Sequence, residues 1–589
     1  MNPAAAQTTI QSGRFLFADA APEDIFTRED VSEEQQLFAR TAERFMRDEV
    51  LPQAEQIHAK DWEITRRLLR QAGELDLLRI DIPEQYGGLG LDKISSALVS
   101  EQTALNASFA GTVSAQTGIG TLPIVYFGTP EQRAKYLPRL ASGELISCFC
   151  LTEPGSGSDA LAAKTKATLS EDGKYYLLRG QKMWITNGGI ADLFIVFAKV
   201  NGEKFTAFIV ERGPGLLSGH EEKKLGLDGS STTAITFEDC RVPVENVLGE
   251  IGRGHVVAFN TLNFGRLKLG NRNVSSAKIA LNHALAYAME RHQFGRPIAS
   301  FGLIQRKLAE MAVRCYAGDA ATFRTVGMVD RALEAVGQGG PAQVMKTIEQ
   351  HAIECSIIKV WTSEMLGYVA DEGLQTYGGY GYSKDYPLER IVRDARIARI
   401  YEGTNEINRL VIATRLLKSA AEGGMLNQHG DKTGSDGPGK RRSANHAAVI
   451  TDRIAEAKKT GILALRAVNR CFGEAAREQQ QVLALVADIV IDTYVMESTW
   501  LRTKKRMNRE DGEASQLQIE MTTVFACDAA DRIAVNARNL AGALAENGQG
   551  EDAQLSEASL RFFKQSPVDT VTLRRNIADA LIAARRYAW

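Results

Sequence analysis

The spacing of apolar residues divides the chain into helical and strand-like regions. Between residues 32 and 147 apolar residues recur at the spacing of amphipathic helices. Ser32 to Gln35 match a capping box at the start of the first of these helices. Between residues 148 and 257 short alternating runs replace this period, and Asp172-Gly173 separates two runs as a hairpin turn would. We predict an N-terminal helical domain at 32–147 and a middle antiparallel β-domain at 148–257.

The helical period returns after residue 257. Long amphipathic stretches cover roughly 258–293, 302–334, 341–370 and 404–420. They predict a four-helix domain at 258–420. The polar, glycine-rich residues 421–446 are typical of a linker. We expect four further long helices in a separate domain at 447–589, and an N-terminal arm at 1–31. The predicted fold class is α+β, with most of the chain helical.

The composition narrows the classes of function. Of the 589 residues, 44% are hydrophobic and 24% are charged, which is ordinary for a folded protein of several domains. The net charge of −2 gives no reason to expect a nucleic-acid partner. No uninterrupted apolar run approaches the roughly 20 residues that a membrane-spanning helix needs, so we expect no integral membrane segment.

The cysteines and the N-terminus favour a reduced compartment. The seven cysteines are scattered and match neither a zinc-binding spacing nor a redox motif, so we expect no metal site. The first residues contain no apolar signal core and carry early acidic residues. We therefore expect a cytoplasmic protein.

The segment LTEPGSGSD at residues 151–159 is a candidate anion-binding loop. Gly155, Gly157 and Ala160 match the G-x-G-x-x-A pattern of dinucleotide-binding loops. A Rossmann unit is excluded, because Thr-Glu-Pro separates the strand from the glycines and a hairpin follows instead of a helix. Small residues with free backbone N–H groups still form an anion cradle. A plain Gly/Ser turn is the more frequent explanation of this segment taken alone.

Three other segments suit parts of a nucleotide cofactor. Trp184 and Thr186 share a strand face and would suit a flat heteroaromatic ring with polar edges. Arg291 and Arg296 flank a helix exit, and guanidinium groups suit a pyrophosphate. The glycines of residues 375–382 permit close approach of a ligand to the backbone. Each segment taken alone has a more frequent structural explanation. Trp184 could simply be a core tryptophan, each arginine could form a surface ion pair, and the glycines could form an ordinary loop.

Glu402 is a candidate catalytic carboxylate. It follows Ile400 and Tyr401 and precedes Gly403 and a predicted helix start near Thr404, so a bound ligand would bury it and raise its pKa. A lone glutamate at a helix entrance usually interacts only with the helix dipole. The chain has no Ser–His–Asp order, no HExxH and no GxxxxGK[ST]. It therefore lacks the motifs that the corresponding hydrolases and NTPases need.

Together and in this order, five motifs closely resemble those of the acyl-CoA dehydrogenases. They are LTEPGSGSD, KMWITNGG, RHQFGRPI, LQTYGGYGY and RIYEGTNEINRL. The resemblance covers about residues 35–418, and the C-terminal extension with FGLIQRKLAEMA is similar to the very-long-chain branch. It implies an N-terminal helical domain, a middle β-domain, a four-helix domain and an added helical domain, with FAD at the junction of the first three.

The resemblance also assigns roles to individual residues. Arg291, Phe294 and the loop at 375–379 would reach FAD across a dimer interface. The expected substrate contacts are Ser158, Asn263, Arg266 and Gly403. The expected FAD contacts are Phe149, Leu151, Thr152, Gly157, Ser158, Trp184, Ile185, Thr186, Arg291, Phe294, Gln375, Gly378, Gly379, Thr404, Asn405 and Glu406.

In this family the residue at Glu402 is the catalytic base. It takes the α-proton of an acyl-CoA thioester while a hydride leaves the β-carbon for the flavin, and the backbone N–H of Glu402 with a ribityl hydroxyl stabilises the thioester oxygen. Some members carry the base on an earlier helix, but the matching place here is near Gly265, which has no side chain.

The resemblance implies a flavoprotein oxidoreductase for the first step of fatty acid β-oxidation, with long-chain acyl-CoA as substrate. Small residues between Ala104 and Gly120 would permit a deep acyl channel. We expect electron-transfer flavoprotein as electron acceptor, with oxygen as the alternative that related oxidases use. We also expect a homodimer, because the C-terminal domain would occupy the surface by which tetrameric members pair. Two alternatives are a flavin-dependent dehydrogenase of another acyl thioester, such as a carrier-bound group, and a non-catalytic assembly or scaffold protein.

Overall fold

The computed structural model describes residues 12–337, 341–422, 446–509, 515–545 and 550–589. The predicted linker at 421–446 lies almost wholly outside these residues. Helix α1 (Glu33–Phe45) begins with the predicted capping box, in which Ser32 accepts the Gln35 N–H and the Gln35 side chain accepts the Ser32 N–H. The helices that follow are α2 (Ala54–His58), α3 (Trp62–Glu74), α4 (Lys93–Thr103), α5 (Ala107–Ser114), η7 (Ala115–Gly120), α6 (Leu122–Phe127) and α7 (Pro130–Ala141).

The β-domain is a twisted sheet with the strand order β6-β7-β3-β2-β4-β5-β8, and β1 pairs with β4. Most pairs are antiparallel, but β4 pairs in parallel with β1 and with β2, so the predicted antiparallel sheet needs this correction. The cause is the long connection between β1 and β2, which is no hairpin and returns the chain to the sheet in the direction of β4. The strands are β1 (Ser147–Cys150), β2 (Lys166–Leu169), β3 (Tyr175–Thr186), β4 (Leu193–Val200), β5 (Lys204–Glu211), β6 (Leu216–Glu221), β7 (Thr232–Pro243) and β8 (Val247–Leu248).

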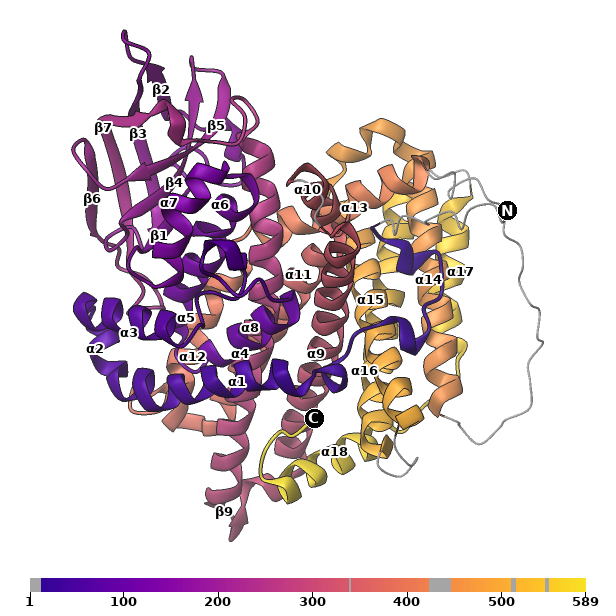
Figure 1. Cartoon of the computed structure of the whole chain (residues 1–589). Coiled ribbons are helices and arrows are strands. Elements are labelled where there is room, and N and C mark those ends of the chain that lie inside the picture. Colours follow the sequence, from indigo (N-terminus) through magenta and orange to yellow (C-terminus); the bar gives the residue numbers. More distant parts are fainter. Residues whose placement is uncertain (1–11, 338–340, 423–445, 510–514, 546–549) are drawn as a thin grey trace, which may run out of the picture.

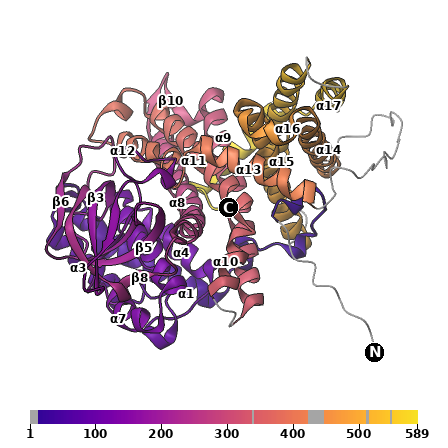
Figure 2. The ribbon, with the colours of Figure 1, turned by 90° about the horizontal axis from the view of Figure 1, so that it is seen from above.

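Four long helices form the next part of the molecule. Helix α11 is buried along nearly its whole length, because α8 and α9 flank it on one side and α13 on another (Figures 1 and 2). The stretch predicted as one helix at 341–370 is two helices, since the chain breaks at Gln350 and His351. The bounds are α8 (Gly254–Glu290), α9 (Gly302–Val336), α10 (Pro341–Glu349), α11 (Ala352–Tyr377), α12 (Pro387–Ala395) and α13 (Asn405–Glu422), and the hairpin β9 (His292–Gln293) to β10 (Arg296–Pro297) joins α8 to α9.

The C-terminal extension lies on the side of these helices away from the sheet (Figure 2). Its described residues form five helices instead of the four expected: α14 (His446–Phe472), α15 (Gln480–Arg509), α16 (Gln516–Leu544), α17 (Glu551–Lys564) and α18 (Thr570–Ala584). The additional helix arises because a break containing Pro567 separates α17 from α18, which begins anew with Asp569 as its cap. Within the described part of the chain, no helix combines the length and apolarity needed to cross a bilayer.

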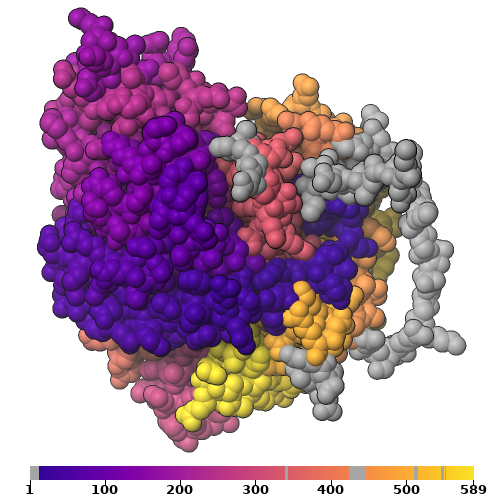
Figure 3. Space-filling view, viewed as in Figure 1, coloured from indigo at the N-terminus to yellow at the C-terminus, as the bar shows by residue number. Residues whose placement is uncertain are grey.

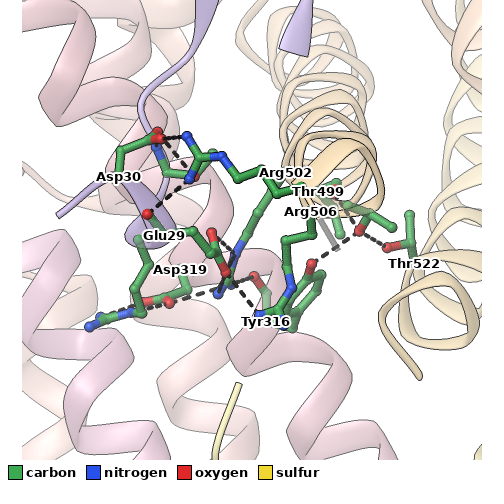
Figure 4. A network of polar contacts seen from close by, with 12 residues as sticks. Glu29, Asp30, Tyr316, Asp319, Thr499, Arg502, Arg506 and Thr522 are labelled. Atoms are coloured by element: carbon green, nitrogen blue, oxygen red, sulfur yellow. Dashed lines mark hydrogen bonds and ion pairs between the residues drawn. The ribbon is translucent and has the colours of Figure 1, made fainter. Parts of the chain in front are cut away.

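The N-terminal arm joins the extension to the dehydrogenase-like part. In Figure 3 the indigo N-terminal segments run across both parts. Figure 4 shows the contact between Glu29 and Arg502 of α15, in which Glu29 accepts at 2.7 Å. Asp30 accepts from Lys505 of α15 at 2.6 Å. Arg28 binds Asp319 of α9, so consecutive arm residues bind two parts of the molecule.

Candidate functional site

Glu402 lies in the short loop before α13, with its carboxylate directly against α8. A Cβ atom at Gly265 of α8 would stand 2.7 Å from Oε2 and 2.8 Å from Cδ of Glu402. The carboxylate of Glu402 therefore occupies the space that a side chain at position 265 would fill. The resemblance had placed Gly265 where some family members carry their base. The Oε2 atom is buried and has no hydrogen-bond partner among the described residues. An unpartnered carboxylate oxygen in such a place is available to a ligand proton.

Three side chains hold the backbone of this loop. Glu402 and Gly403 have φ angles of 58° and 80°, which is an unfavourable conformation for a glutamate. Arg266 of α8 donates to the Glu402 carbonyl at 3.1 Å, and Lys359 of α11 donates to the Gly403 carbonyl at 2.7 Å. Asn408 of α13 donates to the Gly403 and Thr404 carbonyls at 2.8 and 3.0 Å. We call Arg266, Lys359 and Asn408 the carbonyl clamp.

The surroundings of Glu402 act on the pKa of its carboxyl in two opposite directions. Burial raises the pKa of its carboxyl, while the positive charges of Arg266, Lys359 and Arg272 oppose that rise. None of these three cations forms an ion pair with the Glu402 carboxylate within the described chain. Burial also lowers the pKa of Lys359 to about 7, with the charge of Arg266 acting in the same direction. The carboxylate thus stays basic without being neutralised by a direct partner.

The second half of the site comes from the end of β3. Trp184 has a φ of 57° at an irregularity in the pairing of β3 with β7, and its side chain is 60% exposed. Ile185 is buried, and Thr186 is partly exposed. The shared face of Trp184 and Thr186 stays a prediction, because the positive φ of Trp184 and the shift in pairing interrupt the alternation of β3. An exposed indole beside a hydroxyl is a surface on which a flat polar ring can lie.

The loop at residues 151–159 is fixed to β3 by a buried ion pair. Lys182 of β3, which is fully buried, donates to Glu153 Oε1 at 2.7 Å and to the Leu151 carbonyl at 3.2 Å. The Met183 N–H donates to the Thr152 carbonyl at 2.9 Å. Glu153 also accepts the Lys164 and Thr165 N–H groups. Of the expected contacts, Phe149 is buried in β1, whereas Gly157 and Ser158 are exposed at the loop tip.

A chain of hydrogen bonds connects the strand end to the Glu402 loop. Asn187, next to Thr186, donates to the Thr112 carbonyl of α5 at 3.1 Å. Two residues further along α5, Ser114 accepts from Arg272 of α8 at 2.7 Å. Arg272 also donates to the hydroxyl of Tyr401 at 2.7 Å. The β3 end, α5, α8 and Glu402 therefore border one region, and the structure brings these predicted residues together.

The remaining predicted contacts form a separate group. Arg291, at the end of α8, places its guanidinium 5.4 Å from the Tyr380 ring, next to Gly378 and Gly379. Phe294 at the tip of the β9–β10 hairpin is 93% exposed. Arg291 lies 25 residues along α8 from Arg266, which is about 37 Å of helix. Within one chain this group does not reach Glu402, and its expected role across a dimer interface stays a prediction.

The three residues predicted to contact FAD after Glu402 differ in exposure. Thr404 caps α13 by accepting the Ile407 N–H at 3.2 Å, and Glu406 lies exposed in the first turn. Asn405 is buried, and its side chain binds Lys359 and Ser363. The expected substrate residues Asn263 and Arg266 are also buried, with Arg266 donating to Asn263 Oδ1 at 2.8 Å.

Sequence reasoning missed Lys182, Lys359 and Arg272. Lys359 interrupts the apolar run CSIIKVW in α11, and a lone lysine in an apolar helix is a signal that could have found it. Lys182 occupies an inward position of an alternating strand, which is a similar signal. For Arg272 no local signal exists, because its partners come from α5 and the Glu402 loop.

The residues present fit FAD. A Cβ at Gly155, Gly157, Gly378 or Gly379 would meet no atom within 4 Å, so the backbone at both loops is open to a ligand. Trp184 and Arg291 are exposed, and Glu402 Oε2 has no partner among the described residues, so these side chains are free to meet a ligand as predicted.

Comparison with known proteins identifies relatives along nearly the whole chain. Sequence models of the acyl-CoA dehydrogenase N-terminal, middle and C-terminal domains match residues 32–144, 148–240 and 252–417, and a second acyl-CoA dehydrogenase C-terminal domain matches 456–560. A "Probable acyl-CoA dehydrogenase" of Bacillus subtilis is 42% identical over 98% of both chains. The human mitochondrial very long-chain specific acyl-CoA dehydrogenase is 42% identical over 351 residues, which are 58% of this chain and 51% of that protein.

A solved structure extends the comparison to the fold. The crystal structure of an acyl-CoA dehydrogenase complexed with FAD from Bacillus anthracis superposes with a TM-score of 0.93 at 42% identity, over 99% of this chain and 100% of that one. The predicted family, fold and cofactor are confirmed. The chain belongs to the acyl-CoA dehydrogenase family of FAD-dependent enzymes.

Proposed function

We propose that this chain oxidises long-chain fatty acyl-CoA to trans-2-enoyl-CoA, the first step of fatty acid β-oxidation. The observation that carries the proposal is the buried, unpartnered Oε2 of Glu402, held against Gly265 in a loop with a fixed backbone. FAD, when bound, accepts the hydride that leaves the β-carbon. Trp184 and Thr186 would hold its ring, and Arg291 of a second subunit its phosphates.

Glu402 takes the α-proton of the thioester. Its raised pKa makes it a better base than an exposed glutamate, and the charges of Arg266 and Lys359 oppose that rise. We assign the Glu402 backbone N–H as a donor to the thioester oxygen, because the carbonyl clamp keeps this loop rigid before substrate arrives. We assign Ser158 and Gly403 to the substrate and Asn263 with Arg266 to its CoA end, Arg266 acting also on the loop.

Long-chain specificity is supported by the relationship to very long-chain specific enzymes and by the helical extension. A second acyl thioester, such as a carrier-bound group, is the alternative substrate class. The six buried cysteines carry thiols and no disulfides, which supports our assignment to the cytoplasm. We propose electron-transfer flavoprotein as the electron acceptor.

The test is an anaerobic titration of the purified protein with acyl-CoA thioesters of increasing chain length, following the oxidised flavin band. We expect bleaching that is strongest with long chains and absent in Glu402→Gln. A yellow protein that no acyl-CoA bleaches would exclude this substrate class. A colourless protein that does not bind added FAD would favour the scaffold alternative.

We propose that the enzyme is a homodimer. The exposed Phe294 and the open loop at Gly378 and Gly379 lie far along α8 and α11 from Glu402, so they would complete a site only in a second copy. Light scattering of the holoenzyme should give a mass of twice the 64.4 kDa chain. A monomeric or tetrameric mass would contradict this proposal.

A further inference from the structure

Side-chain hydrogen bonds run from the Glu402 loop into helix α11. Lys359, which donates to the Gly403 carbonyl at 2.7 Å, also donates to Asn405 Oδ1 at 2.6 Å. The Asn405 amide in turn donates to Glu364 Oε1 at 3.0 Å. A lysine ammonium only donates and an ionised carboxylate only accepts, so these two neighbours fix the orientation of the amide between them. The backbone of the loop is therefore connected to the carboxylate of Glu364.

Arg409 of α13 carries this connection to the C-terminal extension. Its two terminal nitrogens donate to Glu364 Oε1 and Oε2 at 2.8 and 3.0 Å, and its Nε donates to Asp488 Oδ1 of α15 at 2.7 Å. One planar guanidinium thus binds two carboxylates from different helices. Figure 2 shows α13 between α11, which carries Glu364, and α15. We call the following five residues the relay: Lys359, Asn405, Glu364, Arg409 and Asp488.

The last link of the relay lies at a cavity on the boundary between the two parts of the molecule. The cavity has a volume of about 480 Å³ and lies between α9, α11 and α13 on one side and α15 and α16 on the other. Its wall includes Glu364, Arg409 and Asp488, so these side chains bridge α13 and α15 beside an open space. The Arg409 side chain is only 18% exposed and is shared by two carboxylates. Such a bidentate network is stronger than an isolated surface ion pair.

The relay also acts on the charge of Lys359. Burial lowers the pKa of this lysine to about 7, and the carboxylate of Glu364 is one of the anions that oppose this shift. A protonated ammonium donates a stronger hydrogen bond to the Gly403 carbonyl than a neutral amine does. A Glu364 side chain held in place by Arg409 therefore supports the carbonyl clamp through both its hydrogen bond and its charge.

We propose that Asp488 is a positioning residue for the proposed acyl-CoA dehydrogenation, on which this inference rests. Through the relay, the C-terminal extension holds the Glu402 loop in the shape that presents the carboxylate to a substrate. The loop needs this support because Glu402 has a φ of 58°, which is unfavourable for a glutamate. Without Asp488, Arg409 keeps one carboxylate partner but loses its attachment to α15. Glu364 and Asn405 then move more freely, and the loop moves with them.

Hydrogen–deuterium exchange of the holoenzyme tests this inference without any substrate. The variant is Asp488→Ala, which keeps a good helix former in α15. The matched control is Asp492→Ala, one turn further along α15 in the wall of the same cavity, where Asp492 pairs with Arg532 at 2.8 Å inside the extension. Peptides that cover residues 400–408 should exchange roughly threefold faster or more in Asp488→Ala. In Asp492→Ala they should exchange at the wild-type rate.

Stopped-flow flavin reduction by an acyl-CoA then measures the consequence for catalysis. Asp488→Ala should lower the limiting rate of reduction roughly threefold to tenfold, the range expected for a residue that acts through others. The apparent Kd of the acyl-CoA should not change, because the base is displaced and the substrate contacts are not. Asp488→Glu, which keeps a carboxylate, should recover part of the rate. Asp492→Ala should keep the wild-type rate even if its unfolding midpoint in urea falls.

The outcomes separate this inference from the proposed function. If the loop exchanges at the wild-type rate in Asp488→Ala, or equally fast in both alanine variants, the inference is wrong. Faster exchange with an unchanged limiting rate of reduction would also overturn it, because the loop would then be held without consequence for the base. If no acyl-CoA reduces the flavin of the wild type, the proposed function fails instead, and the exchange measurement still decides whether the extension holds the loop.

Discussion

At the scale of single residues, the site keeps a glutamate in a backbone conformation that it would not adopt alone. A non-glycine residue at a positive φ costs on the order of 1–3 kcal/mol, and Glu402 has a φ of 58°. The carbonyl clamp offsets this cost, since it binds the carbonyls of Glu402, Gly403 and Thr404. Lys359 is its most unusual member because it is fully buried and forms no ion pair in the described chain. Its two acceptors are the Gly403 carbonyl and Asn405.

Lys359→Met should lower kcat with little change in KM. Loss of the clamp misplaces the base, for which a factor of up to about a hundred is expected. The positive charge of Lys359 lowers the pKa of Glu402, so its removal raises that pKa. The acid limb of the pH profile of kcat should therefore move to higher pH, which stopped-flow flavin reduction measures.

The matched control is Lys458→Met, which removes another buried lysine, one that pairs with Glu497 in the extension. It should leave the acid limb unchanged. A Lys359→Met enzyme with the wild-type acid limb would refute an electrostatic role for Lys359, even if its stability fell.

At the scale of elements, strand β3 positions Trp184 and the loop at 151–159 by combining an irregularity with a buried ion pair. The irregular pairing with β7 turns Trp184 outward, and Lys182 two residues earlier binds the loop at 151–159 through Glu153. Burial lowers the pKa of Lys182, while Glu153 opposes that shift. The strand and the loop therefore form one rigid wall of the site.

Lys182→Met should destabilise this wall, because it leaves the Glu153 carboxylate buried without its cation. Breaking such a pair costs about 3–5 kcal/mol. We expect a lower unfolding midpoint in urea and a smaller fraction of bound FAD in the purified enzyme. Adding Glu153→Gln should restore most of the stability, since the uncompensated charge is then removed. Equal stability of the single and double variants would show that the pair has no special role.

At the scale of the whole molecule, the extension shares one buried apolar core with α9, α11 and α13, and charged contacts of the N-terminal arm add to it. Arg28 binds Asp319 of α9, and the next residue, Glu29, binds Arg502 and Arg506 of α15. Burial would raise the pKa of Glu29, but the charge and hydrogen bond of Arg502 lower it to about 2. The arm thus makes the position of α15 depend on ionised carboxylates.

Docking of the extension should weaken in acid. Because the pKa of Glu29 is lowered on folding, its contribution is complete above its unfolded pKa of about 4.3 and is lost as the pH falls toward about 2. Limited proteolysis at low ionic strength should therefore release the extension progressively over this range. Glu29→Gln should make the extension easier to cleave already at neutral pH, with a loss of roughly 3 kcal/mol. Identical cleavage of wild type and Glu29→Gln would contradict a role for this contact.

The sequence by itself determined the family, the cofactor, the order of the parts and the local structure. The capping box at Ser32, the hairpin at Asp172-Gly173 and the Glu402 loop before α13 depend on neighbouring residues, so local reasoning could find them. The tertiary structure alone decided the parallel pairing of β4, the separation of α17 from α18, and the partners of Lys182, Lys359 and Arg272. These features depend on residues far apart in the chain: Lys359 lies 44 positions from Gly403, and Arg272 lies 129 positions from Tyr401. Side-chain charge is visible in a sequence, but whether a charge is buried, shared or left without a counter-ion depends on what the fold packs against it.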